Sequence, residues 1–220
     1  MNEIIDYYDN LAELYESDRF ENSYGKFIDS QERKILDELL TNKNEIVLDL
    51  ACGTGRLLNY ATHGSDASQN MIKQAVLKYP NKTILLNDAE KTSFEDSSID
   101  TIICFHFFMH LNQSKIDKIL LECKRILKPN GRLIFDIPSK KRRQLLNYKA
   151  KNWHGAFSMS FEEISKNNDF KIGKKFGILL TPIHRLPSKI RPFFNPIDRM
   201  LTASFLKEYS SYLVLEFIKK

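Results

Sequence analysis

Apolar side chains follow two different spacings along the chain. Residues 2–18 and 26–41 place them three or four positions apart, which is typical of amphipathic helices. After residue 44, short apolar runs alternate with helical stretches, and this alternation predicts right-handed crossovers within a mainly parallel sheet. We expect strands at residues 45–50, 64–66 (a stunted one), 82–87, 99–106, 131–137, 170–180 and 211–218, and helices at residues 54–61, 68–79, 113–127 and 160–167.

Between the last two expected strands lies a proline-rich segment. Residues 181–206 contain four prolines, which exclude one continuous helix through the segment. No repeat or low-complexity linker divides the chain. We therefore expect a single domain over residues 1–220, with a helical cap at residues 1–42 and an insertion at residues 181–206.

Charge is distributed unevenly. Residues 137–220 hold 17 Lys and Arg against 6 Asp and Glu, a net charge of +11, whereas residues 1–136 carry −6. A basic surface of this size suits either an anionic partner or a solvated lysine-rich face, and both interpretations stay open.

The N-terminus, the longest apolar run and the cysteines indicate the compartment. The first ten residues are acidic and lack the apolar core of a signal peptide. The longest apolar run, residues 102–111, is too short to span a bilayer and contains two histidines. Cys52, Cys104 and Cys123 show no paired spacing, so we expect reduced thiols in a cytoplasmic protein, with no zinc site.

Residues 47–58, VLDLACGTGRLL, are typical of a strand, a glycine turn and the start of a helix. Backbone amides in such a turn point outward, and glycine allows a ligand to approach them closely. A dinucleotide-binding turn continues as G-x-G-x-x-G, but Leu58 stands in place of the third glycine. A phosphate-binding G-x-x-x-x-G-K-[ST] loop is absent. The turn therefore favours a nucleotide-like ligand other than a dinucleotide or a nucleoside triphosphate.

Three motifs together carry a family resemblance. The pattern D-x-A-C-G-T-G at residues 49–55, the run GSDAS at 64–68 and the run KPNGRL at 128–133 resemble, in order and spacing, the class I S-adenosylmethionine-dependent methyltransferases of the small-molecule type. The resemblance covers about residues 4–180. It implies an α/β, Rossmann-like, doubly wound sheet of seven strands in the order 3-2-1-4-5-7-6, with strand 7 antiparallel. The cofactor then lies at the carboxyl ends of strands 1, 2 and 4.

The resemblance also assigns residues to S-adenosylmethionine and its product S-adenosylhomocysteine. Asp49 is placed for the amino group, Asp66 for the ribose hydroxyls and Asp88 for the adenine amine. Ala51 stands where a glycine is commonest, and the short segment before Asp66 makes its contact the least secure. The implied cofactor residues are Asp49, Ala51, Gly53, Gly55, Asp66, Ala67, Met71, Asp88, Ala89, Phe105 and Tyr15.

Proton removal is the chemical task left to other residues. Methyl transfer is an in-line displacement, so the enzyme orients the nucleophile and, for some acceptors, removes a proton. His106 and His110 follow one strand and Asp136 ends another, although each also suits a packing or capping role. We predict that His110 or Asp136 assists proton removal and is more important than His106. A metal would need a third ligand beside the two histidines, and we find none in the sequence.

A missing motif and the composition of one segment narrow the choice of methyl acceptor. Residues 104–110, CFHFFMH, replace the Asn/Asp-Pro-Pro-Tyr motif of enzymes that methylate nucleobase amines, which makes nucleic acid a less favoured partner. Basic and large apolar residues mix within residues 184–194. They suit a lid over an amphipathic or anionic small molecule or lipid-like acceptor, with peripheral membrane contact. The alternatives are an RNA-binding methyltransferase and a methyltransferase-like subunit that activates a partner.

Overall fold

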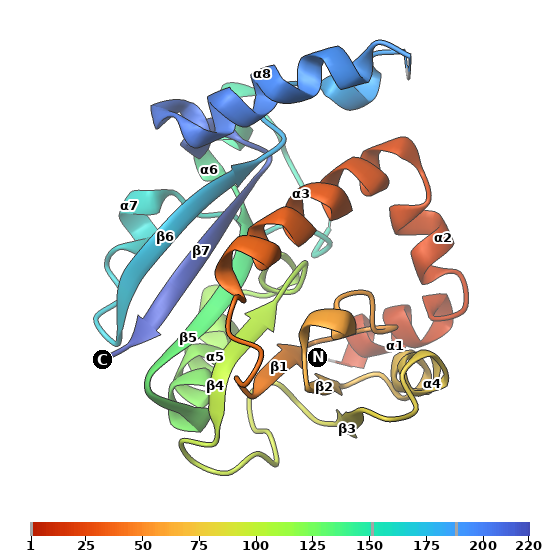
Figure 1. Cartoon of the computed structure of the whole chain (residues 1–220), viewed down its shortest axis with the longest axis vertical. Coiled ribbons are helices and arrows are strands. Elements are labelled where there is room, and N and C mark those ends of the chain that lie inside the picture. The colour runs from red at the N-terminus through yellow and green to blue at the C-terminus, as the bar shows by residue number, and fades with distance from the viewer. Residues whose placement is uncertain (1, 151, 188) are drawn as a thin grey trace.

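A mixed sheet organises the molecule in this computed structural model, which describes residues 2–150, 152–187 and 189–220 (Figure 1). Within these residues the sheet has seven strands in the order β3-β2-β1-β4-β5-β7-β6. The pairings from β3 to β5 are parallel, and β7 runs antiparallel to both β5 and β6. The predicted strand order and the antiparallel seventh strand are confirmed. The strands are β1 (Val47–Leu50), β2 (His63–Asp66), β3 (Thr83–Leu86), β4 (Ile99–Cys104), β5 (Leu127–Pro138), β6 (Phe170–Ile178) and β7 (Tyr212–Lys219).

Helices cover both faces of the sheet, with α3 on the near side and α5 on the far side in Figure 1. Short polar residues cap several of them. Asn22, for example, accepts hydrogen bonds from two amides at the start of α3, and Ser68 accepts one at the start of α4. The α-helices are α1 (Asn2–Leu11), α2 (Tyr15–Phe20), α3 (Ser23–Leu39), α4 (Gln69–Lys78), α5 (Gln113–Ile126), α6 (Lys140–Leu145), α7 (Phe161–Ile164) and α8 (Arg191–Ala203). The described residues also form the 3₁₀ turns η1 (Leu58–Tyr60), η2 (Phe108–His110), η3 (Ile183–Arg185) and η4 (Phe205–Tyr209).

The core has two halves, one on each face of the sheet. Neighbouring residues of β4 show this division, because Ile102 and Ile103 are both fully buried but belong to different hydrophobic clusters. The first cluster includes Ile119 of α5, and the second includes Leu36 of α3. A central parallel strand that is covered on both faces is rich in consecutive apolar residues, and the run at residues 102–105 is the basis of the strand predicted at residues 99–106.

Three local predictions differ from the structure. Residues 54–61 form turns and η1 instead of a helix, because Gly53 and Gly55 have positive φ angles of 55° and 85°. The helix expected at 2–18 is two helices, α1 and α2, and the break at Leu14 allows α1 to pack on α4. The strand expected to reach residue 106 stops at Cys104, because His106 has a φ of +56°.

The proline-rich segment contains η3 and α8 and is not one continuous helix, as expected. Pro192 lies in the first turn of α8, where the missing amide hydrogen costs no hydrogen bond. Figure 1 shows α8 lying across one end of the molecule, beyond β6 and β7. Residue 188 of this segment, like residues 1 and 151, lies outside the described residues. No helix in the described part of the chain is long and apolar enough to cross a membrane.

Candidate functional site

A cavity of about 720 Å³, its open mouth included, lies at the carboxyl ends of β1, β2 and β4. Its floor is the glycine turn after β1, and α1 and the start of α2 contribute Ile4, Tyr8 and Tyr15 to its wall. Most of the cofactor residues implied by the resemblance line it. These are Tyr15, Ala51, Gly53, Asp66, Ala67, Met71, Asp88, Ala89 and Phe105.

Asp66 holds the glycine turn in place. Its Oδ2 accepts a hydrogen bond from the Gly53 amide at 2.8 Å, and its Oδ1 accepts one from the Ser68 amide at 2.9 Å. Burial raises the pKa of Asp66, although these amide hydrogen bonds oppose the shift. Each carboxylate oxygen can accept a second hydrogen bond, so this side chain can shape the turn and still face a ribose hydroxyl.

Asp49 lies beneath the cavity and lines a smaller one beside it, which shares Tyr15 and Gly53 with the first. The carboxyl group is almost fully buried. Burial raises the pKa of Asp49 to about 7, although the Arg56 guanidinium opposes the shift. A buried acid of this kind gains a charge partner when a cationic group enters.

Gly55 is the one implied cofactor residue that lines neither cavity. A Cβ at this position would lie 2.9 Å from Leu58 Cδ1 and 3.3 Å from the Tyr79 ring. Because its φ is also positive, Gly55 is required for packing behind the turn. Met71 is buried next to Gly53. Asp88 accepts a hydrogen bond from the Glu90 amide at 2.9 Å.

A second cavity adjoins the first and has an aromatic wall. It has about 680 Å³, open mouth included, and Phe20, Tyr24 and Tyr212 line it together with Arg19. The two cavities share the side chains of four residues. These are Tyr8, Tyr15, His106 and His110.

His110 is engaged at both ring nitrogens. Its Nδ1 accepts a hydrogen bond from the Gly155 amide at 3.1 Å, so the neutral ring carries its proton on Nε2. That nitrogen lies 2.9 Å from the Tyr8 hydroxyl and donates to it. Burial lowers the pKa of His110 to about 3, and nearby His154 adds to the effect. His110 is therefore neutral at pH 7 and orients Tyr8.

His106 lies between two carboxylates. Its Nε2 is 2.7 Å from Glu32 Oε1, and its Nδ1 is 3.5 Å from Asp136 Oδ2. Burial would lower the pKa of His106, but Glu32 and Asp136 outweigh it and raise that pKa. Asp136 also accepts the His106 amide hydrogen bond at 2.6 Å, and burial raises its own pKa to about 6. Asp136 lines neither cavity and reaches the site through His106.

Glu32 was not recognised from the sequence. It lies on α3, is fully buried, and contacts Arg56 Nη1 at 2.8 Å. Burial would raise the pKa of Glu32, but Arg56 and His106 hold it at about 2. The signal was present, because Glu32 lies four residues after Ile28 and four before Leu36, on the apolar stripe of that helix.

Glu32 and Asp136 also change the argument about a metal. Together with His106 they bring three potential ligand atoms within 4.8 Å of one another, but this group does not include His110 and is not the histidine-pair site that the sequence analysis considered. Arg56 occupies the same neighbourhood and ion-pairs with Glu32. The cluster is thus held together by its own opposite charges.

Comparison with known proteins agrees with this geometry. A protein-family model described as "Methyltransferase domain" matches residues 48–135. An uncharacterised protein of Methanocaldococcus jannaschii is 28% identical over 243 residues, covering 96% of this chain and 88% of that protein. A demethylmenaquinone methyltransferase of Thermotoga maritima is 35% identical over 136 residues, which is 58% of each protein.

Solved structures support the fold. The methyltransferase in complex with the Trm112 activator of Haloferax volcanii superposes with a TM-score of 0.70 at 17% identity, covering 96% of this chain and 97% of that one. Residues 48–135 carry a methyltransferase domain, and the chain has the fold of the class I methyltransferases. The predicted family, fold and enzyme class are thereby confirmed, and the methyl donor of this class is S-adenosylmethionine. Magnesium protoporphyrin IX methyltransferase of Synechocystis PCC 6803 superposes with a TM-score of 0.65 at 17% identity, over 100% and 99% of the chains.

Proposed function

We propose that this methyltransferase transfers a methyl group from S-adenosylmethionine to an amphipathic small molecule held in the aromatic cavity. The observation that carries the proposal is the shared wall of the two cavities. Tyr8, Tyr15, His106 and His110 face both of them, so a donor in one and an acceptor in the other meet at these side chains. Holding two reactants at such a junction supplies much of the rate enhancement of a displacement reaction.

The first cavity fits the donor. Asp49 is a buried acid without a hydrogen-bonded cation, which suits the amino group of the cofactor. Asp66 and Asp88 lie farther along the same cavity, at the ends of β2 and β3, where the ribose and adenine would follow. The methyl group itself then faces the junction. The reaction breaks the bond from methyl carbon to sulfur, forms a bond from that carbon to the acceptor, and leaves S-adenosylhomocysteine.

The acceptor is oriented at the junction by Tyr8. Because His110 Nε2 donates to the Tyr8 hydroxyl, the hydroxyl hydrogen of Tyr8 is left to donate to an acceptor oxygen or nitrogen. Burial raises the pKa of Tyr8, so the phenol keeps this hydrogen at neutral pH. In this arrangement His110 acts through Tyr8.

Proton removal by His110 or Asp136 stays a prediction. His110 would first have to release the Gly155 amide, and Asp136 is separated from the aromatic cavity by His106. An acceptor whose reacting atom is already an unprotonated amine or an ionised oxygen needs no such base. We therefore favour an acceptor of that kind.

The lining of the aromatic cavity supports the class of acceptor. Tyrosine and phenylalanine rings give an apolar, stacking wall, and Arg19 adds a positive charge beside it, next to the carboxyl group of Asp18. The Thermotoga relative is named for a quinone and the Synechocystis structure for a porphyrin, and both names describe large conjugated molecules. A conjugated molecule with an anionic group combines these features.

Product analysis tests the proposal. The protein would be incubated with methyl-labelled S-adenosylmethionine and with fractions of a cell extract separated into aqueous and solvent-extracted pools. We expect label in a low-molecular-mass amphipathic product. Label in RNA or protein would overturn the acceptor class. Cofactor binding without turnover in any fraction would point instead to a missing activator, as in the Haloferax complex.

A further inference from the structure

Helix α8 buries polar residues and exposes apolar ones, which is the reverse of an ordinary surface helix. Its buried residues are polar, namely Asp198 and Thr202. Asp198 accepts hydrogen bonds from the amide and hydroxyl of Thr181, both at 2.7 Å, and from Gln31 Nε2 at 3.0 Å. These bonds fix the rotation of the helix about its axis, because they leave a carboxylate facing the protein.

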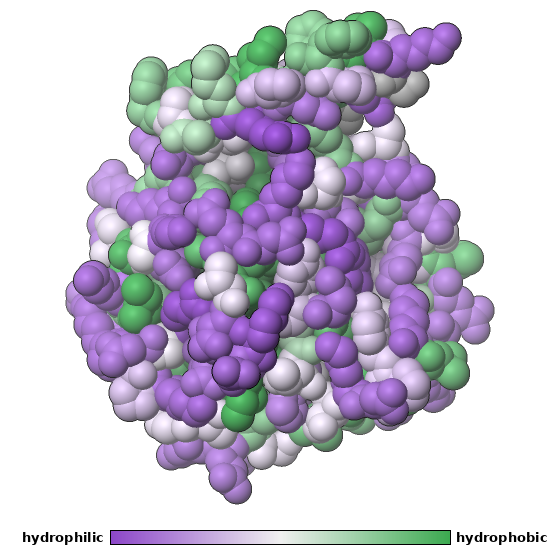
Figure 2. Space-filling view, viewed as in Figure 1, coloured by the Kyte–Doolittle hydropathy of each residue, from purple (hydrophilic) through white to green (hydrophobic). Residues whose placement is uncertain are grey.

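The opposite side of α8 is apolar and faces solvent. Phe193 is 77% exposed and Met200 is 66% exposed, and Ile197, midway between them on the same stripe, is 45% exposed. Phe205 of η4, just after the helix, is 87% exposed. Figure 2 shows hydrophobic surface gathered at the end of the molecule formed by α8. An exposed, contiguous apolar face of this kind marks an interaction surface.

The substrate does not account for this face. Residues of α8 and η4 line neither the cofactor cavity nor the aromatic cavity. The lid expected at residues 181–206 is therefore not over either cavity in this structure. The exposed Phe193 and Phe194 of the segment therefore indicate a binding partner outside the active site.

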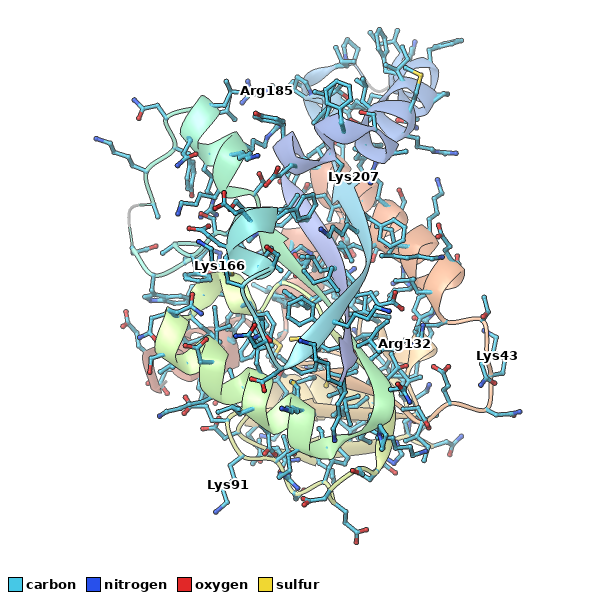
Figure 3. The ribbon with its side chains drawn as sticks, turned by 90° about the vertical axis from the view of Figure 1, so that its left-hand side faces the viewer. Lys43, Lys91, Arg132, Lys166, Arg185 and Lys207 are labelled. Carbon is cyan, nitrogen blue, oxygen red and sulfur yellow. The ribbon has the colours of Figure 1, made fainter. Side chains whose placement is uncertain are left out.

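The charge around this face indicates what the occupant is. The acids between residues 181 and 209 are Asp198, which is buried, and Glu208, which is mostly buried and ion-pairs with Lys141, whereas Arg185, Lys189, Arg199 and Lys207 flank the apolar residues. Arg185 and Lys207 lie beside α8 at the same end of the molecule, and Lys91 lies at the opposite end (Figure 3). Apolar side chains with cations beside them, and no exposed acid among the described residues of α8 and η4, complement a surface that is apolar beneath a layer of negative charge.

We propose that α8 and η4 bind the surface of an anionic lipid bilayer, with Phe193, Met200 and Phe205 among the acyl chains and the flanking Lys and Arg side chains at the lipid phosphates. A short helix with aromatic and aliphatic residues on one face and bases at its edge binds membranes in this way, lying in the interface without crossing it. The proposal does not depend on the identity of the methyl acceptor.

Co-sedimentation with vesicles tests it. The full chain would be mixed with vesicles of phosphatidylcholine alone and with vesicles that also contain phosphatidylserine. We expect binding to the anionic vesicles only, and weaker binding at raised salt. The variant F193S/M200S/F205S should bind roughly tenfold more weakly or not at all. The variant L14S/L77S removes exposed apolar side chains elsewhere and should bind like the wild type.

Thermal unfolding of each variant would establish that it is folded, since exposed substitutions of this kind cost little stability. A variant that removes positive charge, R185S/K189S/K207S, should lose the preference for anionic vesicles. Absence of binding to any vesicle, or equal binding by F193S/M200S/F205S, would overturn the proposal. A dimer of the wild type that this triple variant abolishes would show that a second copy covers the face, and would also overturn it.

Discussion

The Tyr8 hydroxyl lies 2.9 Å from Nε2 of His110, although 102 positions separate the two residues in the chain. The contact ties the N-terminal helix to η2, the turn that follows β4. The Gly155 amide occupies the other ring nitrogen of His110 and so leaves the ring proton on Nε2, where it is donated to Tyr8. The helical cap is thus part of the site, and the junction between the two cavities exists only when α1 is in place.

The Tyr8–His110 contact predicts a loss of turnover without a loss of cofactor. Tyr8→Phe and His110→Ala should each lower kcat by about tenfold, the equivalent of one hydrogen bond. Affinity for S-adenosylhomocysteine, measured by calorimetry, should stay the same. A loss of about 10²–10⁴-fold in His110→Ala alone, with Tyr8→Phe unaffected, would instead identify His110 as the base.

Asp49 predicts a pH dependence of cofactor binding. Its pKa in the free protein is raised to about 7 by burial, and the amino group of the cofactor binds the ionised form. Below pH 7 Asp49 must lose its proton before the cofactor binds. The affinity for the cofactor should therefore fall by up to about tenfold per pH unit as the pH decreases. Above pH 7 the contribution of Asp49 should be constant.

Calorimetric titration with S-adenosylhomocysteine between pH 5 and 8 measures this dependence. Asp49→Asn serves as the control, because the amide cannot ionise and should bind weakly at every pH. The same slope in wild type and Asp49→Asn would place the titrating group elsewhere.

Asp66 and Asp88 are predicted to differ in their effect on stability. The short segment before Asp66 suggested a weaker cofactor contact at that residue, but in the structure Asp66 also accepts hydrogen bonds from the Gly53 and Ser68 amides. Asp66→Ala should weaken cofactor binding and also lower the free energy of unfolding by about 1–3 kcal/mol, because two amides lose their partner. Asp88→Ala should weaken binding and leave stability unchanged. Denaturant unfolding measures the stability of each variant, and calorimetry measures its affinity for the cofactor. Equal stability of both variants would contradict the role of Asp66 in holding the glycine turn.

Glu32 predicts a pH-dependent contribution to stability. Its pKa is lowered to about 2 in the folded protein, so its stabilising effect is complete above its ordinary pKa and is lost as the pH falls toward 2. Glu32→Gln should destabilise the protein at pH 7 by less than the about 3–5 kcal/mol of a buried ion pair broken outright, because Arg56 keeps Asp29 and His106 keeps Asp136. The difference between wild type and variant should shrink when unfolding is measured at pH 3. A difference that is constant between pH 7 and pH 3 would show that Glu32 is not ionised in the folded chain.

The residues that could be assigned from the sequence are those whose role depends on close neighbours in the chain. The turn at residues 51–55 has three positive φ angles, and glycine provides two of them, at Gly53 and Gly55, while Ala51 adopts the third. The strand order was predicted from the family resemblance that the same local motifs carry. The buried parallel strands were predicted from their runs of apolar residues. The position of Asp66 and Asp88 beside the cavity could be predicted because each ends or closely follows a strand at that edge of the sheet.

Other features were decided by the tertiary structure alone. Glu32 meets His106, and Tyr8 meets His110, only because α1 and α3 fold back over the ends of the strands. The direction in which α8 presents its phenylalanines depends on the hydrogen bonds of Asp198 to Thr181 and Gln31. In the sequence, the amphipathic pattern of that helix is the same whichever face is buried. Periodicity shows that a helix has two faces, but only the contacts with the rest of the protein determine which of them meets the solvent.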